Sequence, residues 1–345
     1  MPRTVGGAFE QFRRDVVDLD PNDTNIARRS RKYLFDQIEI LAKNNSDFPK
    51  LTSGSPFISF GSFARKTKIK PLDDIDFLVI LNGTYIAPEI IDFSNTQKLK
   101  FIRPSISFVG TRPSMTLEPL ADRNGYINST TVLNKIKFYL SSVTNYEKAE
   151  ISRNWEAVTL KLNSYTWNYD IVPAIPLFYN SGDLAYFSIP DGKGNWKPTN
   201  PRIDEHHTTT VNTYHEGKFL PVIRLLKYWN GITYNKQRLP SYYFETLAIK
   251  VFERSPKIAN LQNGVKLFFE RCSYYLSQPC PDPKGLGPHL DANIDWSQKQ
   301  KVMNVIVNAS MCAENALRYE SRSQHKEAIE QWQRIFGSRF PNYGY

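Results

Sequence analysis

The chain has 345 residues, of which 41% are hydrophobic and 13% aromatic, and its formal net charge is +10. This composition supports a real core and excludes a chain dominated by disorder. The length fits two packed lobes that share one cleft, or one large domain. The basic balance suits an anionic partner such as a nucleotide, a nucleic acid or an acidic membrane surface, although net charge informs association rather than fold.

The cysteines and the apolar segments indicate the cellular compartment of the protein. Cys272, Cys280 and Cys312 form no disulfide framework and fit a reducing cytosol. Cys272, Cys280 and His289 contain no CxxC pair, so buried or incidental cysteines are favoured over a zinc site. The N-terminal stretch MPRTVGGAFEQFRRDVVD lacks the apolar core of a signal peptide, and no window reaches the ~18 apolar residues of a membrane span. We therefore expect a soluble, cytoplasmic protein without a membrane partner.

The first half of the chain predicts a mixture of helices and strands. Apolar residues at helical spacing predict a long helix over 22–44, which Asp23 or Thr24 can cap. A further helix is expected over 131–143, and residues 83–125 are left unassigned. Short apolar segments predict strands at 56–60, 77–81, 157–162 and 169–175.

The second half predicts helices. Residues 180–215 are rich in Gly, Pro, Asn and Thr and predict a long irregular connection. From Glu216 the spacing becomes helical, interrupted by a Pro/Gly loop over 279–289. Later helices are expected over 242–254, 260–277, 296–320 and 324–336. The sequence therefore predicts an α/β catalytic lobe over 1–215, a mostly helical lobe over 216–340 and a flexible tail over 341–345.

Three aspartates carry the pattern of chemical interest. Gly61 and Ser62 are followed, after eleven residues, by Asp74 and Asp76 at the mouth of an apolar strand, and Asp170 opens a later strand. Residues i and i+2 of a strand point to the same side, so Asp74 and Asp76 share a face. If the two strands are neighbours, all three carboxylates converge.

Converging carboxylates call for cations. They repel one another and titrate at raised pKa values unless hard cations lie between them. Mg²⁺ typically takes one or two carboxylates together with phosphate oxygens. Two Mg²⁺ or Mn²⁺ ions held by Asp74, Asp76 and Asp170 can activate an attacking hydroxyl and stabilise a leaving pyrophosphate.

The Gly61-Ser62 turn is the candidate grip on the phosphates. Glycine lets the backbone approach closely, and a following helical turn aims N–H groups at a triphosphate. Arg65, Lys66 and Lys68 lie nearby and add positive charge. Taken singly, the aspartates could form a solvated turn and Gly-Ser is a common dipeptide. The joint pattern of strand, Gly-Ser, fixed gap, Asp-x-Asp and a third strand-borne aspartate favours the functional interpretation.

The segment GSFARKT…DDIDFLVIL resembles the nucleotidyltransferase signature of the DNA polymerase β superfamily. Within that superfamily the chain resembles the bacterial cGAS/DncV-like nucleotidyltransferases, which make cyclic oligonucleotide signals in anti-phage defence. NWEAVTLKL…YDIVPAIP, FLPVIRLLKYWN, LPSYYFETLAIKVF, the Asp-Pro at 282–283 and EAIEQWQRIFGSRFP extend the likeness over roughly residues 55–340. The resemblance implies a polymerase β-like α/β lobe with a mixed sheet and a helical C-terminal lobe like that of oligoadenylate synthetase.

The resemblance also implies nucleotide contacts in the helical lobe. Lys227 would contact the triphosphate, Ser241 would hydrogen-bond a phosphate and Tyr242 would stack on a nucleobase. The alternatives are a snorkelling lysine and a plain core tyrosine. No ligand set resembles the zinc module of animal cyclic GMP–AMP synthase, so direct activation by double-stranded DNA through that module is not expected.

The implied reaction joins NTPs into a cyclic di- or trinucleotide, with ATP or GTP as the expected substrates and pyrimidine nucleotides as an alternative. A downstream effector that binds the cyclic product is the implied protein partner, and we expect a monomer. The rivals are an RNA-tailing or tRNA nucleotidyltransferase, an enzyme that transfers a nucleotide to a protein or small molecule, and a non-enzymatic binding module. The last has no need of three aspartates.

The C-terminal residues SRFPNYGY predict a short mobile tail, because Pro341 cannot continue a helix and Gly344 adds freedom. Some members of the resembled family have this end joined to other molecules by ubiquitin-like conjugation enzymes. Tyr345 after a single glycine matches a small-residue terminus only in part. A frayed end without a role is therefore favoured over a site for a conjugation enzyme.

Overall fold

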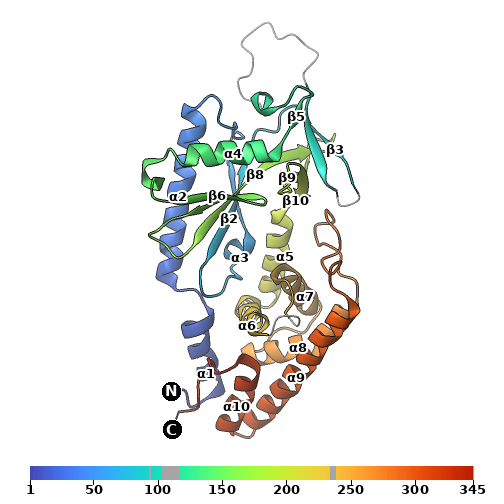
Figure 1. Cartoon of the computed structure of the whole chain (residues 1–345). Helices are drawn as coiled ribbons and strands as arrows, with labels where there is room; N and C mark the ends of the chain where they lie inside the picture. The colour runs from blue at the N-terminus through green and yellow to red at the C-terminus, as the bar shows by residue number, and fades with distance from the viewer. Residues whose placement is uncertain (93–94, 103–116, 234–237, 345) are drawn as a thin grey trace. The chain divides into compact units, whose positions relative to one another are not determined.

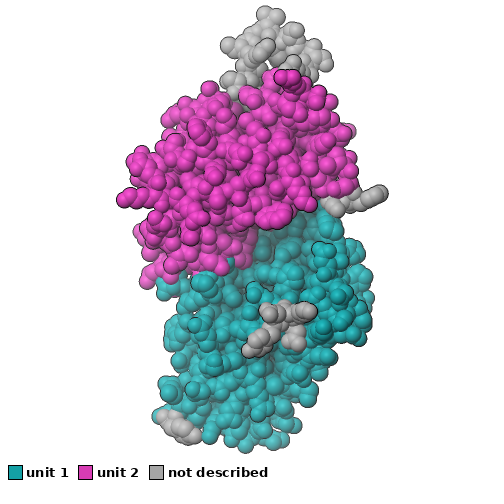
Figure 2. Space-filling view, in the orientation of Figure 1, with its two compact units in different colours: residues 1–20, 65–71, 203–345 teal, residues 21–64, 72–202 magenta. Residues whose placement is uncertain are grey.

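The computed structural model describes residues 1–92, 95–102, 117–233 and 238–344 (Figure 1). The chain forms two compact units, which Figure 2 distinguishes by colour. Unit 1 contains Met1–Asp20, Arg65–Pro71 and Ile203–Tyr345, and unit 2 contains Pro21–Ala64 and Leu72–Arg202. Among the described residues, no helix is long and apolar enough to cross a membrane.

The described part of unit 2 is built on a ten-stranded mixed sheet with the order β1-β2-β8-β9-β10-β4-β3 (Figure 1). β5 pairs with β4, β7 pairs with β8, and β6 pairs with β7. β2 and β8 are parallel, whereas the other pairs are antiparallel. The strands are β1 (Phe57–Phe60), β2 (Asp74–Ile80), β3 (Ile86–Ile90), β4 (Gln97–Phe101), β5 (Tyr126–Ile127), β6 (Glu150–Asn154), β7 (Ala157–Lys161), β8 (Asn168–Phe178), β9 (Leu184–Pro190) and β10 (Trp196–Thr199).

Helices cover this sheet through apolar side chains. On α2 (Pro21–Asn44), Leu34, Ile38 and Leu41 are buried at a spacing of four and three residues, as one face of a helix requires. Phe35 of the same helix stacks on Phe57 of β1 with ring centroids 4.1 Å apart. α4 (Ser129–Leu140) lies against β6, β7 and β9. Shorter turns of helix among the described residues of unit 2 include α3 (Gly61–Ala64) and two 3-10 segments, Glu118–Leu120 and Thr144–Tyr146.

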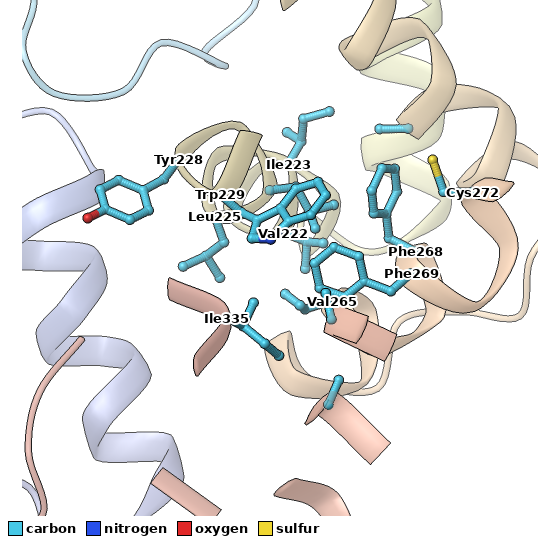
Figure 3. Close-up of a cluster of buried hydrophobic side chains, with 14 of the residues drawn as sticks. Val222, Ile223, Leu225, Tyr228, Trp229, Val265, Phe268, Phe269, Cys272 and Ile335 are labelled. Carbon is cyan, nitrogen blue, oxygen red and sulfur yellow. The ribbon is translucent and has the colours of Figure 1, made fainter. Parts of the chain in front are cut away.

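The described residues of unit 1 form helices joined by loops. Figure 3 shows part of its core, where Trp229 of α6 packs edge-on against Phe269 of α8 with ring centroids 4.8 Å apart. Gly264 of α8 allows this close packing, because a Cβ there would lie 2.7 Å from Val222. Its helices are α1 (Val5–Phe12), a π-helical turn (Arg13–Val17), α5 (Pro201–Tyr214, from residue 203 on), α6 (Phe219–Ile232), α7 (Ser241–Glu253), α8 (Leu261–Ser277), α9 (Trp296–Glu320) and α10 (His325–Phe336).

The mixed sheet and the helical C-terminal part agree with the expected fold class, but the units differ from the expected boundary at residue 215. Residues 1–20 belong to the helical unit, because Phe9 and Phe12 of α1 pack on Phe336 and Phe340 near the C-terminus. The connection expected to be irregular, 180–215, contains β9, β10 and α5. Most of its glycines and prolines lie in or beside the turns between these elements, and Pro198 lies within β10, so they do not prevent regular structure.

The C-terminal tail also differs from the mobile segment that we expected. The Gln333 side chain donates to the Phe340 and Pro341 carbonyls at 3.3 Å and to Asn342 Oδ1 at 2.6 Å. The Gly344 amide donates to the Pro2 carbonyl at 2.9 Å. These bonds attach residues 340–344 to α10 and to the N-terminus. Tyr345 lies outside the described residues.

Candidate active site

The carboxylates of Asp74 and Asp76 lie on one face of β2. Both side chains are partly exposed, whereas Ile75 and Phe77 between and beside them are fully buried. This alternation is the two-residue period of a strand with one face in the core. The strand begins at Asp74, three residues earlier than the expected 77–81, so the two aspartates lie within the hydrogen-bonded ladder and not in the turn before it.

Asp170 lies beside Asp76 on the neighbouring strand. β8 runs parallel to β2, and the register pairs Asp76 with Asp170 and Asp74 with Asn168. Aligned residues of adjacent strands lie on the same face, about 5 Å apart. The condition that the sequence left open, that the two aspartate strands are neighbours, is therefore met. Asp74, Asp76 and Asp170 share one face of the sheet.

Thr159 on β7 is a contact of this group that the sequence analysis did not identify. It is aligned with Asp170, and its Oγ1 donates to Asp170 Oδ1 at 2.6 Å. This bond holds one oxygen of the Asp170 carboxylate. The signal in the sequence was a hydroxyl residue in the otherwise apolar run AVTLKL.

Gly61 touches the same face because it has no side chain. A Cβ built at this position would lie 1.9 Å from Asp76 Oδ2, and the backbone adopts a φ of +72°. Both features restrict the position to glycine. Gly61 follows β1, which pairs with β2 so that Phe60 is aligned with Asp76. Ser62 is the second residue of α3, the short helical turn expected after the Gly-Ser pair.

The donor set of this face consists of carboxylate and hydroxyl oxygens. Within the part of the chain that the structure describes, no three His, Cys, Asp or Glu side chains lie together in a way that could hold a metal ion by themselves. Mg²⁺ takes one or two carboxylates and completes its shell with phosphate oxygens and water. The aligned pair Asp76 and Asp170 fits that partial shell of hard oxygen ligands.

In unit 1, Lys227 is bound to a buried glutamate. Its Nζ lies 2.6 Å from Glu245 Oε1, and only 9% of the lysine side chain is exposed. Burial lowers the pKa of Lys227, and Glu245 offsets part of this shift. Burial alone would raise the pKa of Glu245, but Arg65 and Lys227, with the hydrogen bonds to Lys227 and Thr67, hold it below its ordinary value. Each of the two groups therefore favours the charged form of the other.

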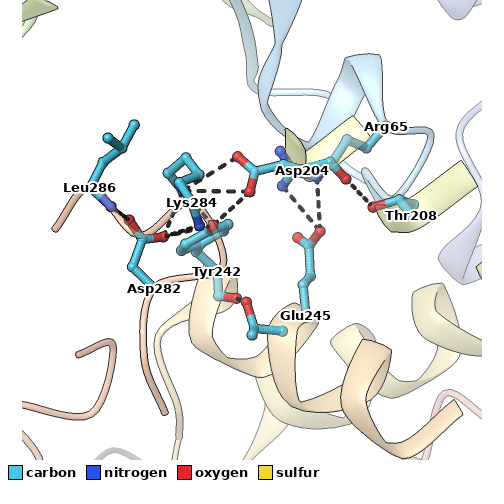
Figure 4. Close-up of polar contacts among 9 residues, drawn as sticks. Arg65, Asp204, Thr208, Tyr242, Glu245, Asp282, Lys284 and Leu286 are labelled. Atoms are coloured by element: carbon cyan, nitrogen blue, oxygen red, sulfur yellow. Dashed lines mark hydrogen bonds and ion pairs between the residues drawn. The ribbon is translucent and has the colours of Figure 1, made fainter. Parts of the chain in front are cut away.

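Tyr242 is held by a second polar cluster, drawn in Figure 4. Its hydroxyl donates to Asp204 Oδ1 of α5 at 2.6 Å, and Lys284 Nζ lies 4.2 Å from the centre of its ring. Lys284 also pairs with Asp282 at 3.1 Å. Burial and the Asp204 carboxylate raise the pKa of Tyr242, so the hydroxyl stays protonated. Ser241 begins α7 and is exposed.

The structure thus groups the expected site residues by unit. Asp74, Asp76, Asp170, Gly61 and Ser62 lie in unit 2, and Lys227, Ser241 and Tyr242 lie in unit 1. Sequence analysis did not identify the partners Thr159, Glu245, Asp204 and Lys284. Thr159 and Glu245 lie in strings that carry the family resemblance, NWEAVTLKL and LPSYYFETLAIKVF, and Lys284 follows the Asp-Pro at 282–283, but none of these strings indicated a partner.

Known proteins that are similar to this chain indicate its family. No protein-family model matches the chain. A Bacillus cereus protein described as a probable cyclic nucleotide synthase is 38% identical over 351 residues, which cover 99% of each chain. A cyclic AMP-AMP-AMP synthase from an Acinetobacter species is 23% identical over 258 residues, covering 70% of this chain and 69% of the relative.

Solved structures share the fold at low sequence identity. The Escherichia coli protein CdnC, solved with ATP, superposes with a TM-score of 0.70 at 16% identity, covering 99% of this chain and 100% of CdnC. Vibrio cholerae DncV, a cyclic AMP-GMP synthase solved with a linear intermediate, gives a TM-score of 0.64 at 11% identity, covering 99% and 97%. These similarities confirm the polymerase β-like nucleotidyltransferase fold.

The fold, together with the similarity to the two cyclic nucleotide synthases, shows that the chain is a nucleotidyltransferase. Within this class, the full-length similarity to the Bacillus cereus synthase is decisive. The chain belongs to the bacterial cGAS/DncV-like nucleotidyltransferases of the DNA polymerase β superfamily.

Proposed function

We propose that this enzyme joins NTPs into a cyclic di- or trinucleotide. The observation that carries the proposal is the full-length relative described as a probable cyclic nucleotide synthase, together with the aligned pair Asp76 and Asp170. The Acinetobacter relative is named for a cyclic trinucleotide. DncV was solved with the linear intermediate pppA(3′,5′)pG, in which two nucleotides are joined before the ring closes. Ring size and base identity are left to experiment.

The proposed reaction is nucleotidyl transfer without a covalent enzyme intermediate. The 3′- or 2′-hydroxyl of one NTP attacks the α-phosphate of another, the new phosphodiester bond forms and pyrophosphate leaves. In the linear product, the free 3′- or 2′-hydroxyl attacks the α-phosphate of the remaining 5′-triphosphate, which closes the ring and releases another pyrophosphate. Catalysis then consists of positioning and charge stabilisation.

Asp74, Asp76 and Asp170 would hold two Mg²⁺ or Mn²⁺ ions. Asp74 and Asp76 would contribute to both ions, and Asp170 to the ion that activates the hydroxyl. When bound, such ions neutralise phosphate charge and lower the pKa of the attacking hydroxyl. Asp170 would also help to take the hydroxyl proton. The bond from Thr159 at 2.6 Å keeps the Asp170 carboxylate in place.

The nucleotide contacts are proposed from the family resemblance and from side-chain chemistry. Gly61 leaves space at the Asp76 carboxylate, and Ser62 with the α3 backbone offers hydrogen bonds to phosphate oxygens. Lys227 supplies an ammonium for the triphosphate. Ser241 offers a hydroxyl to a phosphate, and Tyr242 presents a ring for base stacking.

A role in anti-phage signalling, with a downstream effector that binds the cyclic product, is proposed from the family alone. CdnC has also been solved in a complex named for a HORMA protein, so a protein partner is a reasonable subject for a binding experiment with this chain. No observation on the described residues favours a conjugation enzyme at the C-terminus.

The test is incubation of the purified chain with all four NTPs and Mg²⁺ or Mn²⁺, followed by mass spectrometry. Cyclic di- or trinucleotides that resist phosphatase are the expected products, and omission of single NTPs identifies the bases. Elongation of an added RNA, or nucleotide transfer to an added protein or small molecule with no cyclic product, would overturn the proposal in favour of the rival transferases.

A further inference from the structure

Glu245 of α7 is a buried acceptor that side chains from two other segments of unit 1 contact. Lys227 Nζ of α6 lies 2.6 Å from its Oε1. Arg65 Nη2 lies 3.1 Å and Thr67 Oγ1 2.9 Å from its Oε2. Only 6% of the glutamate side chain is exposed, and 11% of the Arg65 side chain. Figure 4 shows Glu245 pointing from α7 towards Arg65.

The two oxygens of Glu245 therefore hold two different cations. Lys227 is bound by one oxygen and Arg65 by the other, so the carboxylate acts as a spacer between an ammonium and a guanidinium. The cluster of Arg65, Lys227 and Glu245 keeps a net charge of +1 at low exposure. Buried ion pairs contribute little net stability compared with apolar side chains of similar volume, so stability alone is a weak reason for this arrangement. A net positive charge at this place suits an anionic ligand.

Glu245 lies on the helix that carries the other expected nucleotide contacts. It follows Ser241 by four residues and Tyr242 by three, the spacings that place side chains on one side of a helix. Arg65 follows Ser62 by three residues in the chain. A narrow cavity of about 20 Å³, large enough for a single water, is lined by Arg65 and Glu245 as well as by Asp204 and Tyr242. The Glu245 cluster and the Tyr242 cluster are thus neighbours.

We infer that Glu245 is a positioning residue for the triphosphate, which fixes the distance and direction of Lys227 and Arg65 through one carboxylate oxygen each. The inference rests on the proposed contact of Lys227 with the triphosphate and extends it to Arg65. Glu245 itself does not touch the nucleotide. Its carboxylate leaves the remaining donor hydrogens of both cations available for phosphate oxygens, since an ammonium carries three donors and a guanidinium five.

The experiment separates geometry from charge with two substitutions. Glu245→Asp keeps the charge but shortens the side chain by one methylene, and Glu245→Gln keeps the length but removes the charge. Neither can hold both cations as the glutamate does. Each should weaken binding of α,β-methylene ATP or α,β-methylene GTP about tenfold or more, the loss expected for a misplaced charge-assisted hydrogen bond. Binding of AMP or GMP, which lack the β- and γ-phosphates, should change by less than about twofold.

Matched controls make the result specific. Glu253→Gln changes an exposed glutamate on the same helix and should leave the affinities unchanged. Lys227→Met should weaken triphosphate binding by itself. Because Glu245 acts through Lys227 and Arg65, Glu245→Gln should cost less in the Lys227→Met background than in the wild type. If the glutamate variants do not fold, Lys227→Met/Glu245→Met replaces the pair with apolar side chains of similar length and should bind the triphosphate no better than Lys227→Met.

The possible failures are distinguishable. Unchanged triphosphate binding in Lys227→Met would overturn the proposed role of that lysine. A loss in Lys227→Met together with wild-type affinity in Glu245→Asp and Glu245→Gln would overturn the inference about Glu245 and leave the proposed function intact. Equal losses for the triphosphate and the monophosphate in the Glu245 variants would assign Glu245 a structural role only. Wild-type affinity in the double methionine variant would also overturn the inference.

Discussion

The aspartate face of unit 2 and the Glu245 cluster of unit 1 are built in different ways. Asp74 and Asp76 are two residues apart, and Asp170 joins them through one parallel strand pair. Glu245 instead binds Lys227, which is 18 residues away in the sequence, and Arg65, which is 180 residues away. The first arrangement follows from a local period and one strand register. The second depends on the packing of three separate segments, so its residues have no common signature in the sequence.

The largest effect is expected at the aspartate face. Asp74→Asn with Asp76→Asn should leave a folded protein, because the amides keep the volume of the carboxylates, but NTP turnover should fall by at least about a hundredfold to a thousandfold. Turnover can be measured as pyrophosphate release and folding by circular dichroism. Asp73→Asn, at the exposed neighbouring position, is the control. Full activity in the double variant would remove the two carboxylates from the mechanism.

A smaller but still large effect is expected at Gly61. Gly61→Ala places a Cβ 1.9 Å from Asp76 Oδ2 and strains a backbone at φ +72°, so the carboxylate must move. Displacement of a catalytic group by about 1 Å can cost roughly a hundredfold in kcat. Gly182→Ala is the matched control in the same unit, because φ is +88° there and no atom lies within 4 Å of the added Cβ. Equal kinetic losses in both variants would trace the effect to backbone strain alone.

Tyr242 tests the polar cluster of unit 1 in which Asp204 and Lys284, far from it in the sequence, contact its side chain. Tyr242→Ala should weaken nucleotide binding by about 1–3 kcal/mol, the range for base–aromatic stacking. Tyr242→Phe keeps the ring and loses the hydroxyl bond to Asp204, so it should be milder for binding and reduce the free energy of unfolding by about 1–3 kcal/mol. Calorimetry and denaturant unfolding measure the two effects. Comparable binding losses in both variants would show that the hydroxyl, and not the ring face, is what matters.

The pH dependence of triphosphate binding probes Lys227 directly. The ammonium is the binding form, burial lowers its pKa, and Glu245 raises it again in part. Affinity should therefore fall as the pH rises through the pKa of Lys227, and in Glu245→Gln this alkaline loss should begin at lower pH. Lys227→Arg stays protonated and should abolish the alkaline loss. An alkaline limb that persists unchanged in Lys227→Arg would assign the titration to another group.

The smallest effect is expected at the C-terminus. Removal of residues 342–345 should leave NTP turnover unchanged, because the tail contains none of the proposed site residues. The loss of the Gln333–Asn342 and Gly344–Pro2 bonds should lower the melting temperature slightly. Gln333→Ala removes the same side-chain anchor without shortening the chain and should have a similar effect. A large loss of turnover after truncation would connect the tail to catalysis.

The sequence alone determined the helices and strands whose apolar residues follow a clear pattern. The long helix α2, strand β8 and the later helices follow from apolar spacing, and the shared face of Asp74 and Asp76 follows from the two-residue period of a strand. It did not determine residues 180–215, because glycines and prolines in short turns gave the same signal as an irregular connection. It also placed residues 1–20 with the wrong neighbours, because the partners of Phe9 and Phe12 lie more than three hundred residues away.

Only the tertiary structure decided how the polar side chains are paired. The register of β2 and β8 placed Asp170 beside Asp76, and the alignment of β7 added Thr159. The packing of α6, α7 and residues 65–71 placed Lys227 and Arg65 on Glu245, and that of α5 and α7 placed Asp204 at Tyr242. The physical reason is that hydrogen bonds and ion pairs act over a few ångströms in space, whatever the separation along the chain. A local pattern can predict which face a carboxylate occupies, but its partners are chosen by the burial of apolar surfaces elsewhere.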